Sequence, residues 1–362
     1  MALSAFVVTA CSGGGGAART DDVEPTASGS AAVTSSAPAA SCAAAGVAAP
    51  AGCWQKVLPL GSGGFPPAPG SQNEPVWEPG KFPLTLRPQL AIDDELWMAA
   101  QVVAYSSPDG LTWTEHAKTD WGERIYQTLV SFQGKLWMFG GLDYDSGAFL
   151  NDIWVSSDGT TWENAGTAPW SPRGGQAMAV HQGRLWLFGG ADHAAEDRST
   201  DGFLNDVWVS DDGLKWTQVT AAAPWAARDQ AAVVPLGEAL AADEVQGLAD
   251  VWRTADGREW SPVVREAPWK PRHDPARLAF DGKLWVFGGW SGETTNALND
   301  VWFSSDGATW ERQAERAPWA ERAPISVVFD DRIWIYSGKH TGADDNWGGD
   351  LWQMSAVTTQ AS

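Results

Sequence analysis

Five arginines recur at equivalent points of this sequence, each directly ahead of a short apolar segment. Four of them, Arg173, Arg228, Arg272 and Arg322, end the pattern Ala-Pro-Trp-x-x-Arg, and Arg124 is the fifth. A guanidinium group is a planar fork that binds a carboxylate through two hydrogen bonds. Arginines gathered around one channel therefore predict a site for an acidic ligand.

A repeated aspartate offers the same arginines a structural role. The aspartates are Asp152, Asp206, Asp250, Asp300 and Asp350. Unpaired arginines packed around one channel would repel one another. Because arginine and aspartate recur together in the repeats, we favour pairing between them over ligand binding, and we keep ligand binding as the alternative.

Four long segments without strand character, 142–150, 191–204, 290–298 and 339–349, supply further candidates. The ligand-binding candidates in them are Asp143, His193, Trp290 and Trp347, with Tyr144, Asp145, Asp192, His340, Asp344, Asp345 and Asn346 beside them. Tryptophan next to carboxylates and amides suits a sugar, because the ring offers an apolar face and the polar groups bind hydroxyls. In the alternative interpretation, Trp290 and Trp347 pack against neighbouring loops. The histidines are scattered and no calcium-loop signature is present, so we expect neither a metal nor a cofactor.

Four short patterns recur in a fixed order and place these residues on β-strands. They are an apolar strand ending in Leu-Trp-x-Phe-Gly-Gly, then Asn-Asp-x-Trp, then the turn Ser-x-Asp-Gly-x-x-Trp, then Ala-Pro-Trp-x-x-Arg. The tryptophan of the second pattern recurs at 154, 208, 252, 302 and 352, with intervals of 54, 44, 50 and 50 residues. Each unit has room for four short strands joined by turns, which is the composition of a propeller blade.

This order of motifs resembles the Kelch repeat over roughly residues 54–355, including the propeller domain of galactose oxidase. The resemblance implies a β-propeller, most often an interaction platform. In Kelch substrate adaptors, arginines at the matching positions help to form a pocket for acidic peptides. The copper site of galactose oxidase needs a Cys–Tyr crosslink, and this chain has no cysteine after residue 53, so that chemistry is not expected here.

We therefore predict an all-β fold, a six-bladed Kelch-type β-propeller over residues 53–356, with a tail at 357–362. Five units are predicted at 88–115, 124–164, 173–218, 228–262 and 272–312. A sixth begins at Arg322 and is one strand short, so we expect the strand at Trp54 to close it. The long loops and the arginines should share one face, whereas the opposite face should consist of tight turns with little room for a site.

The N-terminal segment predicts that the protein is exported from the cytoplasm. Val8-Thr9-Ala10-Cys11 resembles the lipobox of bacterial lipoproteins, which implies that residues 1–11 are the remnant of a signal peptide and that Cys11 is lipidated. No Lys or Arg precedes the apolar run, a departure from that family. Residues 12–52 are rich in Gly, Ala, Ser and Pro and predict a flexible, disordered linker. Cys42 and Cys53 are then an even pair, and we expect a disulfide between them.

The charge balance excludes some partners. The chain carries 24 basic and 45 acidic residues, a net charge of −21. Binding to a phosphate backbone needs a basic face, so no nucleic-acid partner is expected. An acidic chain gains nothing from anionic lipid, so we expect membrane contact only through the lipid anchor. Repulsion between copies favours a monomer.

Two functions follow. The first is a lipid-anchored or secreted module of the bacterial cell envelope that binds a glycan or a protein on its loop-rich face, without catalysis. The alternative is a Kelch-type sugar epimerase or mutarotase acting on an acidic sugar at the arginines. No nucleophile and base occur at a recognisable spacing, so we favour the binding module and assign no catalytic residue.

Overall fold

Every regular element that the structure describes is a β-strand. The computed structural model describes residues 7–8, 54–58, 89–90, 95–100, 103–192, 202–228, 232–234, 241–243, 250–270, 272, 275–291, 297–340 and 351–355. Within these ranges, no helix has the length and apolar character needed to cross a bilayer. The prediction of an all-β fold is confirmed.

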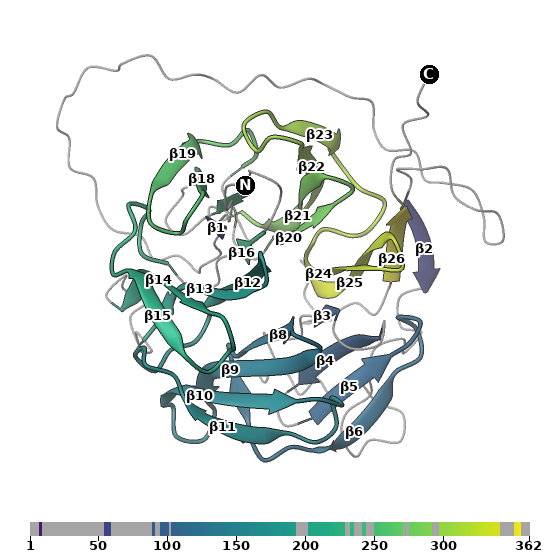
Figure 1. Ribbon diagram of the computed structural model, residues 1–362. Helices are drawn as coiled ribbons and strands as arrows, with labels where there is room; N and C mark the ends of the chain where they lie inside the picture. The colour runs from purple at the N-terminus through teal and green to yellow at the C-terminus, as the bar shows by residue number, and fades with distance from the viewer. Residues whose placement is uncertain are drawn as a thin grey trace.

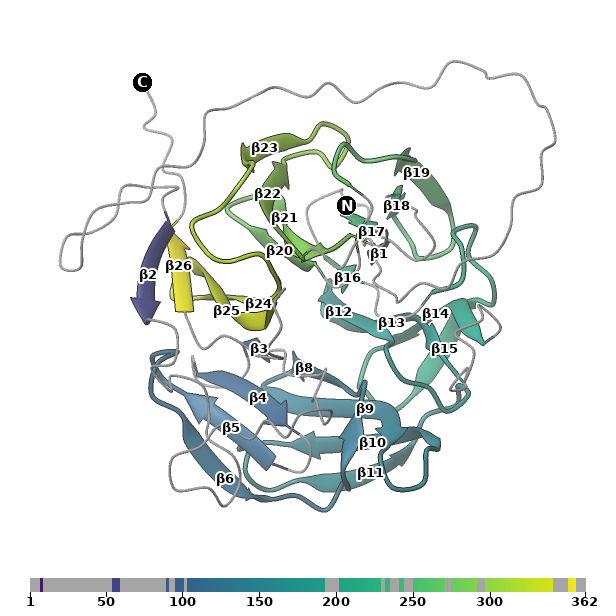
Figure 2. The ribbon, with the colours of Figure 1, turned by 180° about the vertical axis from the view of Figure 1, so that it is seen from behind.

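The strands form small antiparallel sheets arranged like spokes around a central axis (Figures 1 and 2). Five of these sheets have at least four strands and are complete blades. Blade 1 contains β3 (Gln89–Leu90), β4 (Leu96–Ala100), β5 (Val103–Ser107) and β6 (Thr114–Lys118). Blade 2 contains β7 (Arg124–Ile125), β8 (Thr128–Phe132), β9 (Lys135–Asp143), β10 (Phe149–Ser156) and β11 (Glu163–Thr167).

The remaining complete blades follow the same order from the axis outward. Blade 3 contains β12 (Ala177–His181), β13 (Arg184–Ala191), β14 (Phe203–Ser210) and β15 (Trp216–Thr220). Blade 4 contains β20 (Ala276–Phe280), β21 (Lys283–Trp290), β22 (Ala297–Ser304) and β23 (Glu311–Ala314). Blade 5 contains β24 (Arg322–Phe329), β25 (Arg332–His340), β26 (Leu351–Ser355) and β2 (Trp54–Leu58).

The N-terminal strand closes the ring, as the sequence predicted. Strand β2 pairs antiparallel with β26, and Trp54 lies opposite Met354. The two strands are about 300 residues apart in the chain but adjacent in Figure 1. Closure in this way pairs the edge that β26 would otherwise expose.

The prediction of six complete blades is wrong by one. Among the described residues, the unit at 228–262 contributes a three-stranded sheet between blades 3 and 4. Its strands are β17 (Ala241–Asp243), β18 (Asp250–Thr254) and β19 (Trp260–Val264). The first strand of the unit, β16 (Ala232–Val233), pairs instead with β1 (Val7–Val8). The physical reason is the loss of the Leu-Trp-x-Phe-Gly-Gly motif from this unit, because that motif supplies the long second strand in blades 2, 3 and 4.

The apolar core lies in the layers between neighbouring sheets. Between blades 2 and 3, for example, Trp137 and Phe139 pack with Leu185, Leu187 and the connecting Trp170. Each tryptophan of an Ala-Pro-Trp segment meets the closing tryptophan of the next sheet edge to face, as Trp170 meets Trp216 with ring centroids 4.5 Å apart. Such pairs add to the stabilisation from burial.

Trp54 provides a test of ring closure. Its side chain is 1% exposed and meets Trp319 edge to face at 4.3 Å. We expect Trp54→Ala to lower the free energy of unfolding by about 3–5 kcal/mol, because it opens a cavity and weakens the closing strand. Urea unfolding of the full chain measures this loss, with Gln55→Ala on the same strand as the control. Equal losses in the two variants would contradict closure by this strand.

Candidate functional site

Four of the five candidate arginines make two-pronged ion pairs with aspartate. Nη1 of Arg173 lies 2.6 Å from Oδ1 of Asp206, and Nη2 lies 3.0 Å from Oδ2. The same paired geometry joins Arg124 to Asp152, Arg228 to Asp250 and Arg272 to Asp300. The arginine side chains are only 2–3% exposed, and those of the aspartates are 10–16% exposed. The pairing that the sequence favoured is therefore present, and these guanidinium groups lie beneath the surface of the loop-bearing face.

Arg322, the fifth candidate, is fully buried, and its Nε donates to the carbonyl of Ala320 at 3.0 Å. Asp350, the aspartate of its repeat, lies outside the described residues.

Each arginine also donates a hydrogen bond to a nearby backbone carbonyl. Nη1 of Arg173 donates to the carbonyl of Gly189, and its Nε donates to the carbonyl of Ser171. The arginine's own carbonyl accepts a hydrogen bond from Gly141 of the preceding blade at 2.9 Å. One residue thus joins two strands of its own blade and the neighbouring blade, which fixes the inner edge of the ring.

The Asn-Asp-x-Trp motif completes this network. Oδ2 of each paired carboxylate, which accepts from the arginine, also accepts from an indole N–H two residues on, at 2.6 Å between Trp154 and Asp152. The amide of Asn151 donates to the carbonyls of Ala168 and Trp170 and so holds the Ala-Pro-Trp loop. Because these buried polar groups satisfy one another, the network stabilises the face without needing a ligand.

The structure also explains the Gly-Gly pair. A side chain at Gly141, where φ is +103°, would come within 2.9 Å of the backbone nitrogen of Gln127. Glycine therefore allows the inner strand to approach the second strand at this point. Gln127 is held directly against this glycine.

Gln127 and Gln176 form a polar cluster that sequence reasoning missed. Each is the third residue after its arginine, on the inner edges of blades 2 and 3, and they are 8% and 4% exposed. Neither side-chain polar atom of Gln127 makes a hydrogen bond with the described residues, and Oε1 of Gln176 makes none. Nε2 of Gln176 donates to the carbonyl of Phe139 at 2.9 Å. A buried polar group without a partner costs about 1–3 kcal/mol, so this cluster is destabilising as it stands.

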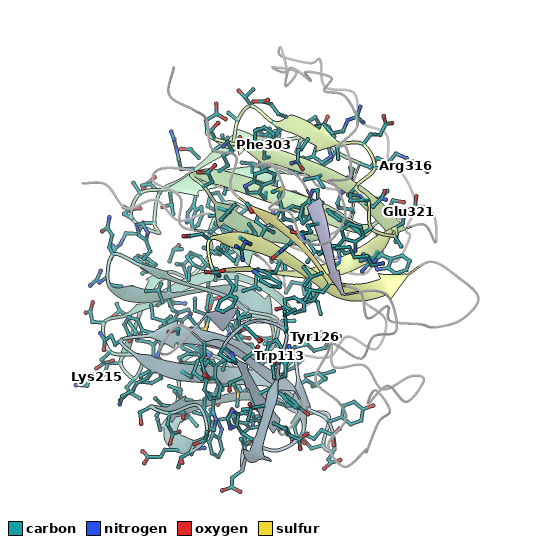
Figure 3. The ribbon with its side chains drawn as sticks, turned by 90° about the vertical axis from the view of Figure 1, so that its right-hand side faces the viewer. Trp113, Tyr126, Lys215, Phe303, Arg316 and Glu321 are labelled. Carbon is teal, nitrogen blue, oxygen red and sulfur yellow. The ribbon has the colours of Figure 1, made fainter. Side chains whose placement is uncertain are left out.

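Tyr126, next to this cluster, has a strained backbone. Its φ is 60°, whereas the other described non-glycine residues with positive φ lie in tight hairpin turns: Gln133, Gln182, Asp281, Asp330 and Asp331. The carbonyl of Tyr126 accepts from Gly175 of blade 3 at 2.9 Å. Strain of this kind costs about 1–3 kcal/mol and concentrates at functional sites. Figure 3 shows Tyr126 with Arg316 and Glu321 toward one side of the molecule, and Lys215 on the opposite side.

The loop at 142–150 lies beside the same end of blade 2. The N–H of Tyr144 donates to the carbonyl of Glu123 at 2.8 Å, and the Tyr144 side chain is 43% exposed. Asp143 accepts from the hydroxyl and the N–H of Ser146, and these bonds lower the pKa of its carboxyl group. Asp143 is therefore an ionised residue that stabilises its own loop.

The other predicted site residues are not brought together with Asp143. Trp290 is half-buried at the end of β21, in a blade across the ring from blade 2 (Figure 1). His193 and Trp347 lie outside the described residues, as do Cys11, Cys42 and Cys53. The described part of the chain also holds no group of three or more His, Cys, Asp or Glu side chains able to bind a metal ion.

A weak sequence signal for the missed cluster exists. Arg-x-x-Gln occurs at 124–127 and again at 173–176, in two adjacent repeats. The spacing alone does not show that the amides are buried without partners.

Comparison with known proteins supports the fold alone. No family model matches the chain, and no curated protein matches it. Among solved structures, the structure of YjhT is similar, with a TM-score of 0.57 and 16% sequence identity, over 77% of this chain and 97% of that chain.

Proposed function

We propose that this protein is a non-catalytic binding module that holds a glycan on its loop-bearing face, at the junction of blades 2 and 3. The observation that carries the proposal is the pair of buried glutamines, because three of their four side-chain polar atoms lack partners among the described residues. An amide offers both a donor and an acceptor. A hydroxyl group also both donates and accepts, so a polyhydroxylated ligand matches the pair.

Two tyrosines at this end of blade 2 support a sugar over other polar ligands. Tyr126 adjoins Gln127 in the chain. The exposed Tyr144 donates a backbone hydrogen bond to Glu123, which lies three residues before Tyr126. Aromatic rings provide an apolar surface for the C–H face of a sugar, while the amides bind hydroxyl groups at its edge. The backbone strain at Tyr126 agrees with a position held for binding.

We favour a neutral glycan over an acidic ligand. An acidic ligand would bind to the candidate arginines through its carboxylate. Four of these five arginines already bind an aspartate in a two-pronged pair. No specific observation supports the epimerase or mutarotase alternative, so we do not extend the proposal to catalysis.

The test replaces an amide by an apolar group of similar size. We expect Gln127→Leu to weaken glycan binding at least about tenfold, since it removes hydrogen bonds that the ligand makes. The same variant should leave the melting temperature unchanged or raise it, because it removes an unsatisfied polar group. Isothermal titration of the full chain against a panel of neutral oligosaccharides, with a melting curve for each variant, measures both effects.

The exposed Gln218→Leu on β15 is the matched control and should change neither quantity. The proposal fails if no oligosaccharide binds the unmodified chain. It also fails if Gln127→Leu lowers the melting temperature and leaves the affinity unchanged, since the glutamine would then be structural.

We also propose that the module is displayed outside the cytoplasm through a lipid on Cys11, with Cys42 and Cys53 joined as a disulfide near the propeller. The support is the lipobox-like Val8-Thr9-Ala10-Cys11 and the Gly, Ala and Ser-rich residues after it. Cleavage ahead of Cys11 would remove β1, so the pairing of β1 with β16 belongs to the uncleaved chain. Metabolic labelling with a fatty acid in a bacterial host should mark the full chain, and Cys11→Ser should abolish the label. Equal labelling of both chains would contradict the anchor.

A further inference from the structure

A cavity of about 350 Å³ opens on the face opposite the loops, between blade 3 and the three-stranded sheet β17–β19. The sequence predicted little room on this face because its connections are tight turns, and the cavity shows that this prediction is wrong here. The strands β13, β14 and β15 supply one wall, and the turn between β18 and β19 supplies the other.

Small side chains in blade 3 leave this space open. Val209 lies opposite Trp186 on the neighbouring strand, where blade 4 has Phe303 opposite Trp285, with ring centroids 5.1 Å apart. Val219 takes the position of His116 in blade 1, whose ring stacks on Trp97 at 5.0 Å. Valine therefore replaces the aromatic side chain of a sister blade at two points. Blade 2 also has a valine, Val155, opposite its strand tryptophan, so the small side chains leave room here but do not by themselves distinguish blade 3.

The cavity is lined by equal numbers of basic and acidic side chains. The basic ones are Arg184, Lys215 and Arg258, and the acidic ones are Asp211, Asp212 and Asp256. One pair is mutually satisfied, since Nε of Arg184 lies 2.6 Å from Oδ1 of Asp211. The chain as a whole has a net charge of −21, whereas the charged side chains that line this cavity sum to zero.

The other two aspartates hold their own turns. Oδ1 of Asp212 accepts from the backbone N–H groups of Leu214 and Lys215 at 2.9 and 2.7 Å. These bonds lower the pKa of the Asp212 carboxyl group, with the N–H of Lys215 the largest cause. Oδ1 of Asp256 accepts in the same way from Arg258 and Glu259. Both carboxylates are therefore occupied by backbone donors.

Two cations line the cavity. Each is attracted by the carboxylate of its own turn, Lys215 by Asp212 and Arg258 by Asp256. The side chains of Lys215 and Arg258 are exposed, come from adjacent sheets and line the same cavity. Neither side chain has an ion pair with a residue that the structure describes. Lys215 is labelled in Figure 3, far from Tyr126 and the proposed glycan site.

We propose that this cavity is a second binding site, for a small dicarboxylate. The two cations match two carboxylate groups, and the guanidinium fork of Arg258 can bind one of them through two hydrogen bonds. The volume suits a molecule of a few carbon atoms, and Trp186, Val209 and Val219 contribute apolar surface for the carbon chain. The site is independent of the glycan site on the other face.

Titration calorimetry with the full chain at low salt tests the proposal, with succinate, glutarate and adipate as probes and butyrate as the monocarboxylate control. We expect saturable binding of at least one dicarboxylate and much weaker binding of butyrate. Lys215→Gln and Arg258→Gln should each weaken that binding roughly tenfold or more, since each removes a charged hydrogen bond. Lys215→Arg should retain it, because the charge is kept.

Two further variants locate the site. Arg316→Gln removes an exposed cation on the opposite side of the molecule and should leave dicarboxylate affinity unchanged (Figure 3). Gln127→Leu should also leave it unchanged, which separates this site from the glycan site. The proposal is overturned if none of the three dicarboxylates binds saturably, if butyrate binds as tightly, or if neither Lys215→Gln nor Arg258→Gln weakens binding.

Discussion

The two-pronged ion pair between arginine and aspartate is the interaction on which the loop-bearing face depends. In blade 3 the pair joins Arg173, at the start of the inner edge, to Asp206 on the third strand, and Arg173 also bonds to Gly189 on the second. Its carbonyl binds Gly141 of the preceding blade. A buried charge is tolerated only when it is paired and fully hydrogen-bonded. In four of the repeats the aspartate supplies this partner, and this explains why the motifs occur together.

The residues that hold the blades together differ from the residues that we propose as binding sites. Most of the repeated residues are occupied by one another, so in our proposals recognition is assigned to other residues. Gln127 and Gln176 are such residues on one face, and the cavity between blade 3 and the three-stranded sheet is such a feature on the other. The cavity lies beside the unit that has lost a motif, whereas the glutamines lie between two intact blades. A propeller of this kind can therefore change its ligands without changing the network that holds its blades.

The fold was largely predictable from sequence, whereas the sites were not. Tryptophan, glycine and aspartate recur at fixed spacing, and each has one structural reason to do so, which made the blades and the closing strand at Trp54 predictable. The unit at 228–262 was counted as a full blade because Asp250 and Trp252 survive, although the strand motif before them is lost. The burial of the Gln127 amide and the space left by Val209 depend on neighbouring blades, which local patterns do not describe.

The most direct test of the account is the free energy of unfolding of a double-mutant cycle at Arg173 and Asp206. Arg173→Met and Asp206→Leu should each cost about 3–5 kcal/mol, because each leaves the other charge buried and unpaired. The double variant should cost clearly less than the sum of the two. If Arg173→Met instead leaves stability unchanged, or if the two losses simply add, the ion pair does not hold this face together and the account is contradicted.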